Sequence, residues 1–160
     1  MASSKVLIAY QTKGGVTAEY AAIIAEVLRE KHHLEVDVVD LAKDGRPDAA
    51  PYYAVIVGSG IRMGMWYGRA KRMLGHTPKE KVAAVYLASG RAGDPKQHQT
   101  AVEKYLTKVL AKKGIRPLAA EAFGGRMVNG GKVTLDNREP EHVRLWAEDV
   151  ARKLEAWEQG

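Results

Sequence analysis

The first segment that could bind a ligand is a glycine-containing loop that leads directly into a helical pattern. It runs Gln11, Thr12, Lys13, Gly14, Gly15, Val16 and Thr17. Adjacent glycines let the backbone turn tightly so that successive N–H groups point to one spot, and the threonines add hydroxyl donors. Because the start of a helix adds partial positive charge, the loop predicts a phosphate site. The alternative without a ligand is a glycine turn whose helix is capped by Thr17.

Three further loops follow apolar runs and carry glycine or charge. The first is Gly60-Ile61-Arg62-Met63-Gly64, the second is residues 89–94, and the third is residues 123–126. We interpret the glycines of the third loop as the exit of a strand into a small hairpin around Asn129-Gly130-Gly131. The spacing of Ser, His and carboxylate residues identifies no catalytic group and no metal site, and His98 is the least unlikely acid or base.

The elements that must position these loops alternate between apolar runs and helical patterns. Strands are expected at 5–10, 34–41, 53–59, 81–88 and 117–123. Helices are expected from Thr17 onward, at 69–75, at 97–113 and from Pro140, and residues 42–52 hold at most a short helix. This alternation predicts an α/β fold, a doubly wound three-layer sandwich with a five-stranded parallel sheet. Ligands of such sheets bind beyond the carboxyl ends of the strands, where the loops above lie.

Length and composition set the class of protein. The chain has 160 residues, is 46% hydrophobic and contains no cysteine, which predicts one domain over residues 1–160 and excludes disulfide and thiolate chemistry. No secretory signal pattern opens the sequence, and no apolar run approaches the ~20 residues of a membrane-spanning helix. We therefore expect a soluble, cytoplasmic protein.

The charge is uneven along the chain. The net charge is +6, with basic residues in excess between positions 62 and 116 and acidic residues in excess after position 136. A basic face attracts nucleic acid, anionic lipid or an acidic small molecule, and solvated lysines on amphipathic helices are the alternative. Charge alone does not choose among these.

Two motifs resemble a known family. The spacing TxxGxT after the first strand resembles the phosphate-binding loop of flavodoxin-like proteins, which hold the 5′-phosphate of FMN there. The segment VGSGIRMG, residues 57–64, is most similar to the flavodoxin-domain branch that includes menaquinone-dependent protoporphyrinogen oxidase. The resemblance covers nearly the whole chain and implies the strand order 2-1-3-4-5.

The resemblance also implies a set of FMN-binding residues. The loop from Thr12 to Thr17 would wrap the phosphate, and the segment from Ser59 to Met63 would follow one edge of the isoalloxazine ring. An aromatic side chain would stack on the ring, and residues 89–94 would bind its pyrimidine edge. Trp66 is the expected aromatic, with Tyr67 as its substitute and packing against the next helix as the alternative role of Trp66. The implied residues are Thr12, Lys13, Gly14, Gly15, Val16, Thr17, Ser59, Gly60, Ile61, Arg62, Met63, Trp66, Ser89, Gly90, Arg91, Ala92, Gly93 and Asp94.

The function implied by this resemblance is an FMN-dependent oxidoreductase. Its expected substrate is an anionic compound of the porphyrinogen type, attracted by the basic residues, with a quinone or another electron acceptor. The alternative is a flavodoxin-type electron carrier that docks on a redox partner protein, although Arg91 stands where carriers usually have an acidic, aromatic-bearing loop. A binding module that has lost the flavin is a third class. No nucleic-acid partner is expected, membrane contact is at most peripheral, and the oligomeric state is open.

Overall fold

A parallel sheet forms the centre of the computed structural model, which describes residues 5–157. Its strands are β1 (Lys5–Gln11), β2 (Glu35–Asp40), β3 (Ala54–Arg62), β5 (Val82–Ala88) and β6 (Ala119–Phe123), in the order β2-β1-β3-β5-β6. The short strand β4 (Met65–Trp66) returns antiparallel to the end of β3. Counting the parallel strands alone gives 2-1-3-4-5, so the predicted α/β sandwich and strand order are confirmed.

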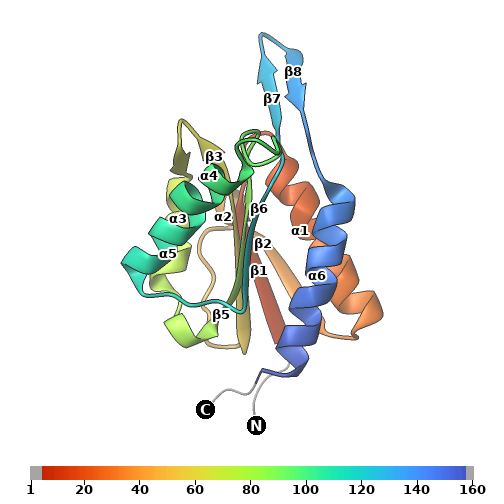
Figure 1. Ribbon diagram of the computed structural model, residues 1–160. Helices are drawn as coiled ribbons and strands as arrows, with labels where there is room; N and C mark the ends of the chain where they lie inside the picture. The colour runs from red at the N-terminus through yellow and green to blue at the C-terminus, as the bar shows by residue number, and fades with distance from the viewer. Residues whose placement is uncertain (1–4, 158–160) are drawn as a thin grey trace.

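Helices cover both faces of the sheet (Figure 1). On one face lie α1 (Val16–Glu26), its π-helical continuation η1 (Val27–Lys31) and α6 (Pro140–Glu155). The other face carries α2 (Leu41–Asp44), α3 (Gly68–His76), α4 (His98–Val102), η3 (Glu103–Thr107) and α5 (Lys108–Lys113). A 3₁₀ turn, η2 (Lys79–Lys81), precedes β5. The predicted helix at 97–113 is therefore a continuous helical segment with a π-helical middle.

Alternate residues of each central strand supply two separate cores. In β1, Val6 and Ile8 pack with α1 and α6, whereas Leu7 and Ala9 pack toward α3 and the helical segment 98–113. All four side chains are fully buried. Burial on both faces explains why the strands are apolar throughout rather than alternating between apolar and polar.

A β-hairpin projects from the carboxyl end of the sheet. Its strands are β7 (Arg126–Asn129) and β8 (Lys132–Asp136), and they pair only with each other. In Figure 1 it extends beyond the sheet at the end where β3 turns into β4. Apart from the half-buried Arg126, every residue of the two strands is exposed. The predicted hairpin is thus present, and it stands beside the ligand-binding edge of the sheet.

Candidate functional site

The predicted loops converge on one cavity of about 1020 Å³ at the carboxyl edge of the sheet. Among the residues implied by sequence, those that line it are Thr12, Lys13, Gly14, Val16, Thr17, Gly60, Ile61, Arg62, Met63, Ser89, Gly90, Arg91 and Asp94. Residues far apart in the chain therefore meet at one place. The reason is topological, because the carboxyl ends of parallel strands lie on one edge.

The loop between β1 and α1 has the geometry of an anion site. Gly15 precedes the helix with φ +89° and donates its N–H to Thr12 Oγ1 at 2.9 Å. As cap residue, Gly15 has no side chain, and the N–H groups of Val16 and Thr17 have no carbonyl acceptor within the helix. The Thr12 hydroxyl, already accepting a hydrogen bond, can direct its own proton outward. These donors face the same space, where partial positive charge accumulates.

The neighbouring helix start is already satisfied. The side chain of Gln11, at the end of β1, accepts hydrogen bonds from the N–H groups of Arg69 and Ala70 at 2.8 and 3.2 Å. One residue of β1 therefore caps α3, while the following residues leave the start of α1 open. Of these two helix starts, that of α1 is the one with N–H groups left to bind an anion.

Of the two adjacent aromatic residues at the end of β4, Tyr67 lines the cavity and Trp66 does not. Trp66 is 7% exposed, packs in the core beneath α3, and donates its indole N–H to the Tyr105 carbonyl at 2.7 Å. The antiparallel return of β4 turns Trp66 inward, which corrects the expectation that it lies against the ring and agrees with the packing alternative. Tyr67 lies against Gly60, where a Cβ would come within 2.7 Å of the Tyr67 ring.

Charge and burial both act on Tyr67. The Lys13 ammonium lies 5.5 Å from the centre of its ring, within the range of a cation–π contact. Burial raises the pKa of the Tyr67 hydroxyl, and the nearby Arg62 charge opposes that rise. Tyr67 is therefore a neutral aromatic wall at neutral pH, with Lys13 drawn toward it.

Five residues implied by the sequence do not line the cavity, namely Gly15, Ser59, Trp66, Ala92 and Gly93. Ser59 is buried and donates its hydroxyl to the Gly60 carbonyl while accepting the Tyr67 N–H at 3.1 Å. Ala92 packs in the core, and Asn137 lies behind Gly93. Ser59 supports the loop, because its hydroxyl fixes the turn that presents Gly60 and Tyr67.

The base of the hairpin supplies cavity residues that the sequence reasoning missed. The hairpin and its ends add Gly125, Arg126, Met127, Val128, Asn129, Leu135 and Asn137 to the lining, and other parts of the chain add Gly64, Ala88, Pro95, Gln97 and Tyr105. Asn137 accepts the Gly125 N–H at 2.9 Å and donates to the Gly90 carbonyl at 2.8 Å, which joins the hairpin to the loop after β5. The sequence signal for the hairpin residues was Gly124-Gly125, two glycines after the end of β6, followed by Arg126.

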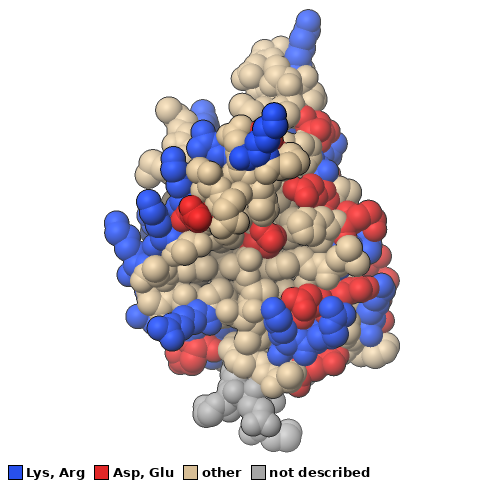
Figure 2. All heavy atoms as spheres, in the orientation of Figure 1, with Lys and Arg blue, Asp and Glu red and all other residues tan. Residues whose placement is uncertain are grey.

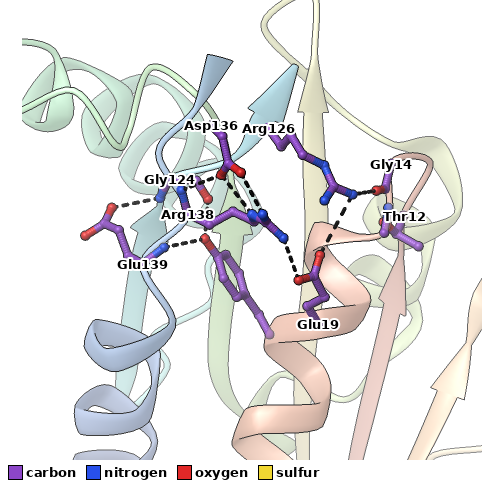
Figure 3. Close-up of polar contacts among 10 residues, drawn as sticks. Thr12, Gly14, Glu19, Gly124, Arg126, Asp136, Arg138 and Glu139 are labelled. Atoms are coloured by element: carbon purple, nitrogen blue, oxygen red, sulfur yellow. Dashed lines mark hydrogen bonds and ion pairs between the residues drawn. The ribbon is translucent and has the colours of Figure 1, made fainter. Parts of the chain in front are cut away.

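The hairpin base is also joined to α1 (Figure 3). Tyr20 donates its hydroxyl to the Gly124 carbonyl and accepts the Glu139 N–H at 3.1 Å. Glu139 in turn accepts the Gly124 N–H at 2.8 Å. Burial raises the pKa of Tyr20 to about 12, so its hydroxyl stays protonated and keeps donating. This closed set of bonds holds the hairpin beside the start of α1.

Asp94 is a carboxylate on the cavity wall, and it accepts the Lys96 N–H at 3.0 Å and a side-chain N–H of Gln97 at 2.9 Å. His98 does not line the cavity, because its ring contacts the Ala92 carbonyl at 2.8 Å and Glu121 at 3.2 Å. Within residues 5–157 no group of three or more His, Cys, Asp or Glu side chains is arranged to hold a metal ion.

A family model for the flavodoxin domain matches residues 7–136. The chain belongs to the flavodoxin domain family. This match spans β1 through β8 and includes every loop of the cavity. The cofactor of flavodoxin domains is FMN, and this chain is an FMN-binding redox protein.

Solved structures share the fold of this flavodoxin domain. Flavodoxin 1 from Bacillus cereus superposes with a TM-score of 0.62 and 20% identity over 92% of this chain and 97% of that one. The rubredoxin oxygen:oxidoreductase from Desulfovibrio gigas gives a TM-score of 0.63 and 20% identity over 97% of this chain. This chain spans only 37% of that oxidoreductase. A comparison with curated protein sequences gives no match.

The residues of this flavodoxin domain fit FMN. No atom lies within 4 Å of the position that a Cβ would take on Gly14, and at Gly15 the nearest is Arg126 Nη2 at 3.9 Å, so the loop borders open space. Thr12, Thr17 and the N–H groups of the loop would hold the phosphate, and Gly60, Tyr67 and Gly90 would border the ring. Bound FMN supplies electron-transfer chemistry, while the protein fixes its orientation and surrounding charge.

The two aromatics of the β4 region make a testable pair. We expect Tyr67→Ala to weaken FMN binding about fivefold, or ~1 kcal/mol, because an aromatic wall is lost. Trp66→Phe should leave the FMN dissociation constant within about twofold. That variant should instead lower the free energy of unfolding by ~1–3 kcal/mol, since the Tyr105 carbonyl loses its donor. Quenching of FMN fluorescence and urea unfolding measure the two effects, and equal weakening by both variants would contradict the assignment.

Proposed function

We propose that this protein is an FMN-dependent oxidoreductase whose substrate is anionic with a largely apolar body, of the porphyrinogen type. A quinone or another acceptor would take up the electrons. The observation that supports this proposal is the composition of the cavity wall. Arg62 and Arg91 border the cavity there together with Met63, Met127 and Leu135. A guanidinium binds a carboxylate through two parallel hydrogen bonds, and the apolar side chains suit an apolar body.

Two apolar projections flank this wall. The turn after β3 carries Met63 and the start of β4 carries Met65, and these side chains are 92% and 66% exposed. On the hairpin, Met127, Val128 and Val133 are also exposed. Exposed apolar groups beside a ligand site are typical of surfaces that bind a substrate or a partner. In this proposal the substrate binds between the projections, and bound FMN would supply the electron-transfer chemistry there.

The surface charge supports an anionic substrate. Figure 2 shows Lys and Arg atoms gathered over the side of the molecule covered by α3 and α5, with acidic atoms more frequent over α6. Long-range attraction by such a surface raises the association rate of an anion. The VGSGIRMG segment supports the finer assignment to the branch that includes menaquinone-dependent protoporphyrinogen oxidase. Protoporphyrinogen is accordingly the first substrate to test.

Electron carriage between proteins is the second candidate. It is favoured by the likeness of the fold to the Bacillus cereus flavodoxin, 97% of which this chain covers. In that case the two apolar projections would contact a redox partner protein, and the surrounding cations would select an acidic one. The net charge of +6 supports the enzyme over the carrier, because carriers of this kind are usually acidic.

The proposal includes a setting for the protein. We propose that residues 1–160 act as a single domain in the cytoplasm, which the absence of cysteine supports. Between residues 5 and 157 no helix has the length and apolar character needed to cross a bilayer. Membrane contact would be peripheral, and no nucleic-acid partner is proposed.

Anaerobic mixing separates the two candidates. As an enzyme, the FMN-loaded protein should lose its visible flavin absorbance within minutes of adding protoporphyrinogen alone. The observed association rate should fall as salt rises, because the Debye length shortens from about 10 Å at 0.1 M to about 3 Å at 1 M. The double variant Arg62→Gln/Arg91→Gln should associate more slowly, whereas Lys43→Gln, exposed on α2, serves as the control. Full FMN occupancy without bleaching would favour the carrier.

A further inference from the structure

The hairpin sends one side chain back to the phosphate loop. Arg126 begins β7, and its Nη2 donates to the Gly14 carbonyl at 2.7 Å (Figure 3). The same nitrogen lies 3.9 Å from the position that a Cβ would take on Gly15, and Arg126 lines the cavity with Thr12 and Thr17. A guanidinium carries five N–H donors, so one bond to Gly14 leaves most of them available.

Lys13, the cation within the loop itself, is directed elsewhere. Its ammonium lies over the Tyr67 ring, on the wall of the cavity formed by β4 and α3. The loop otherwise offers hydroxyl and backbone donors, which carry no full charge. Arg126 therefore brings a full positive charge to the space in front of the start of α1.

A neighbouring carboxylate must be considered, because Glu19 of α1 lies beside the same guanidinium. Glu19 Oε2 is 4.0 Å from Arg126 Nη2, at the limit of an ion pair. Its other oxygen receives Arg138 Nη1 at 2.8 Å, and Arg138 also holds Asp136 at 2.6 Å. Because Arg138 binds the Glu19 carboxylate more closely, Glu19 compensates the charge of Arg126 only in part, and the Arg126 guanidinium can attract another anion.

We propose that Arg126 is a phosphate-binding residue of the FMN site, contributed by the hairpin rather than by the β1–α1 loop. Its guanidinium binds a phosphate oxygen of FMN while its bond to Gly14 keeps the loop in place. The inference rests on FMN occupying the cavity. It also gives the hairpin a part in cofactor selection, since a guanidinium favours the dianionic phosphate of FMN over riboflavin, which has no phosphate.

Parallel titrations with FMN and riboflavin test this assignment. FMN binding to the unaltered protein is measured first. If FMN does not bind, both the FMN site and the role of Arg126 in it are overturned, whereas the variants below test Arg126 alone. Arg126→Gln should then weaken FMN binding about 10- to 100-fold and riboflavin binding less than about twofold. Arg126→Lys should fall between, because lysine keeps the charge and loses the fork.

The matched control lies on the same hairpin. Lys132→Gln removes the same charge from β8, outside the cavity, and should leave the ratio of FMN to riboflavin affinity unchanged. The second pKa of a phosphate monoester is about 6, so the phosphate of FMN loses negative charge as the pH is lowered from 7.5 to 5. The FMN affinity of the unaltered protein should fall over this range, and Arg126→Gln should make the fall smaller. Equal weakening of both flavins by Arg126→Gln, or an unchanged ratio, would overturn the proposal and leave Arg126 as an anchor of the hairpin.

Discussion

Gly15→Val is expected to weaken FMN binding at least about 100-fold while the protein remains folded. Gly15 has φ +89°, a left-handed conformation that a β-branched residue adopts only at a cost of roughly 1–2 kcal/mol. Relief of that strain would rotate the backbone, break the hydrogen bond from the Gly15 N–H to Thr12 and turn the Val16 N–H away from the phosphate. The added side chain would also enter the open space that the loop borders. Titration by quenching of FMN fluorescence measures the change.

A second glycine provides the control for strain. Gly45 has φ +74° and no atom within 4 Å of its Cβ position, and it lies at the end of α2, away from the cavity. Gly45→Val should lower the free energy of unfolding at least as much as Gly15→Val, because φ +74° with ψ −174° is a conformation that almost only glycine adopts, and it should leave FMN affinity unchanged. Equal FMN affinities in the two variants would show that the turn at Gly15 does not hold the phosphate.

Gly58→Ala is expected to lower the free energy of unfolding by ~1–3 kcal/mol and FMN affinity about tenfold. A Cβ at this position of β3 would lie 2.2 Å from Tyr86 Cζ, in a core where Tyr86 is fully buried. The Tyr86 hydroxyl donates to the Thr17 carbonyl at 3.0 Å, beneath the phosphate loop. A displaced Tyr86 would thus disturb the first turn of α1. Urea unfolding and FMN titration measure both effects.

Two comparison variants separate the clash from other causes. Gly75→Ala lies in α3, where the added Cβ meets only the flexible end of Lys113 at 3.3 Å, and it should keep or slightly raise stability. Tyr86→Phe removes the bond to Thr17 without adding volume, and should lower the free energy of unfolding by about 1 kcal/mol. If Gly58→Ala matched Gly75→Ala in stability, the packing argument would fail.

The order of elements was predictable because local patterns and topology rules act together. Continuous apolar runs such as 5–10 and 81–88 become strands only when both faces are covered, and alternating helices supply that cover. The loops at one edge then follow from parallel strands, so the sequence alone predicts that Thr12, Gly60 and Ser89 lie close together. The predicted end of β3 was less accurate. The strand runs through Arg62, beyond the expected end at 59, because β4 pairs with its last residues.

The position of the aromatic could not be read from the sequence. Trp66 and Tyr67 are adjacent, so they point in different directions, and the direction of each depends on the short return of β4. That return gives Trp66 a partner for its indole N–H at Tyr105, a residue 39 positions away. Tyr67 is left on the cavity wall. A change of one position in the turn would exchange the two roles, and periodicity within the segment does not contain this information.

The sequence by itself determined the fold class and predicted a phosphate site in the loop after the first strand, because both depend on residue types at short spacing, and the strand order followed from the resemblance to flavodoxin-like proteins. Glycine at positions 14 and 15, threonines around them and a helix start suffice to define an anion site locally. Only the tertiary structure decided that Arg126, more than a hundred residues later, reaches Gly14, and that Asn137 fixes the hairpin to Gly90. Such contacts depend on how separate elements pack, and the free energy that selects them is shared among many distant residues rather than encoded in one motif.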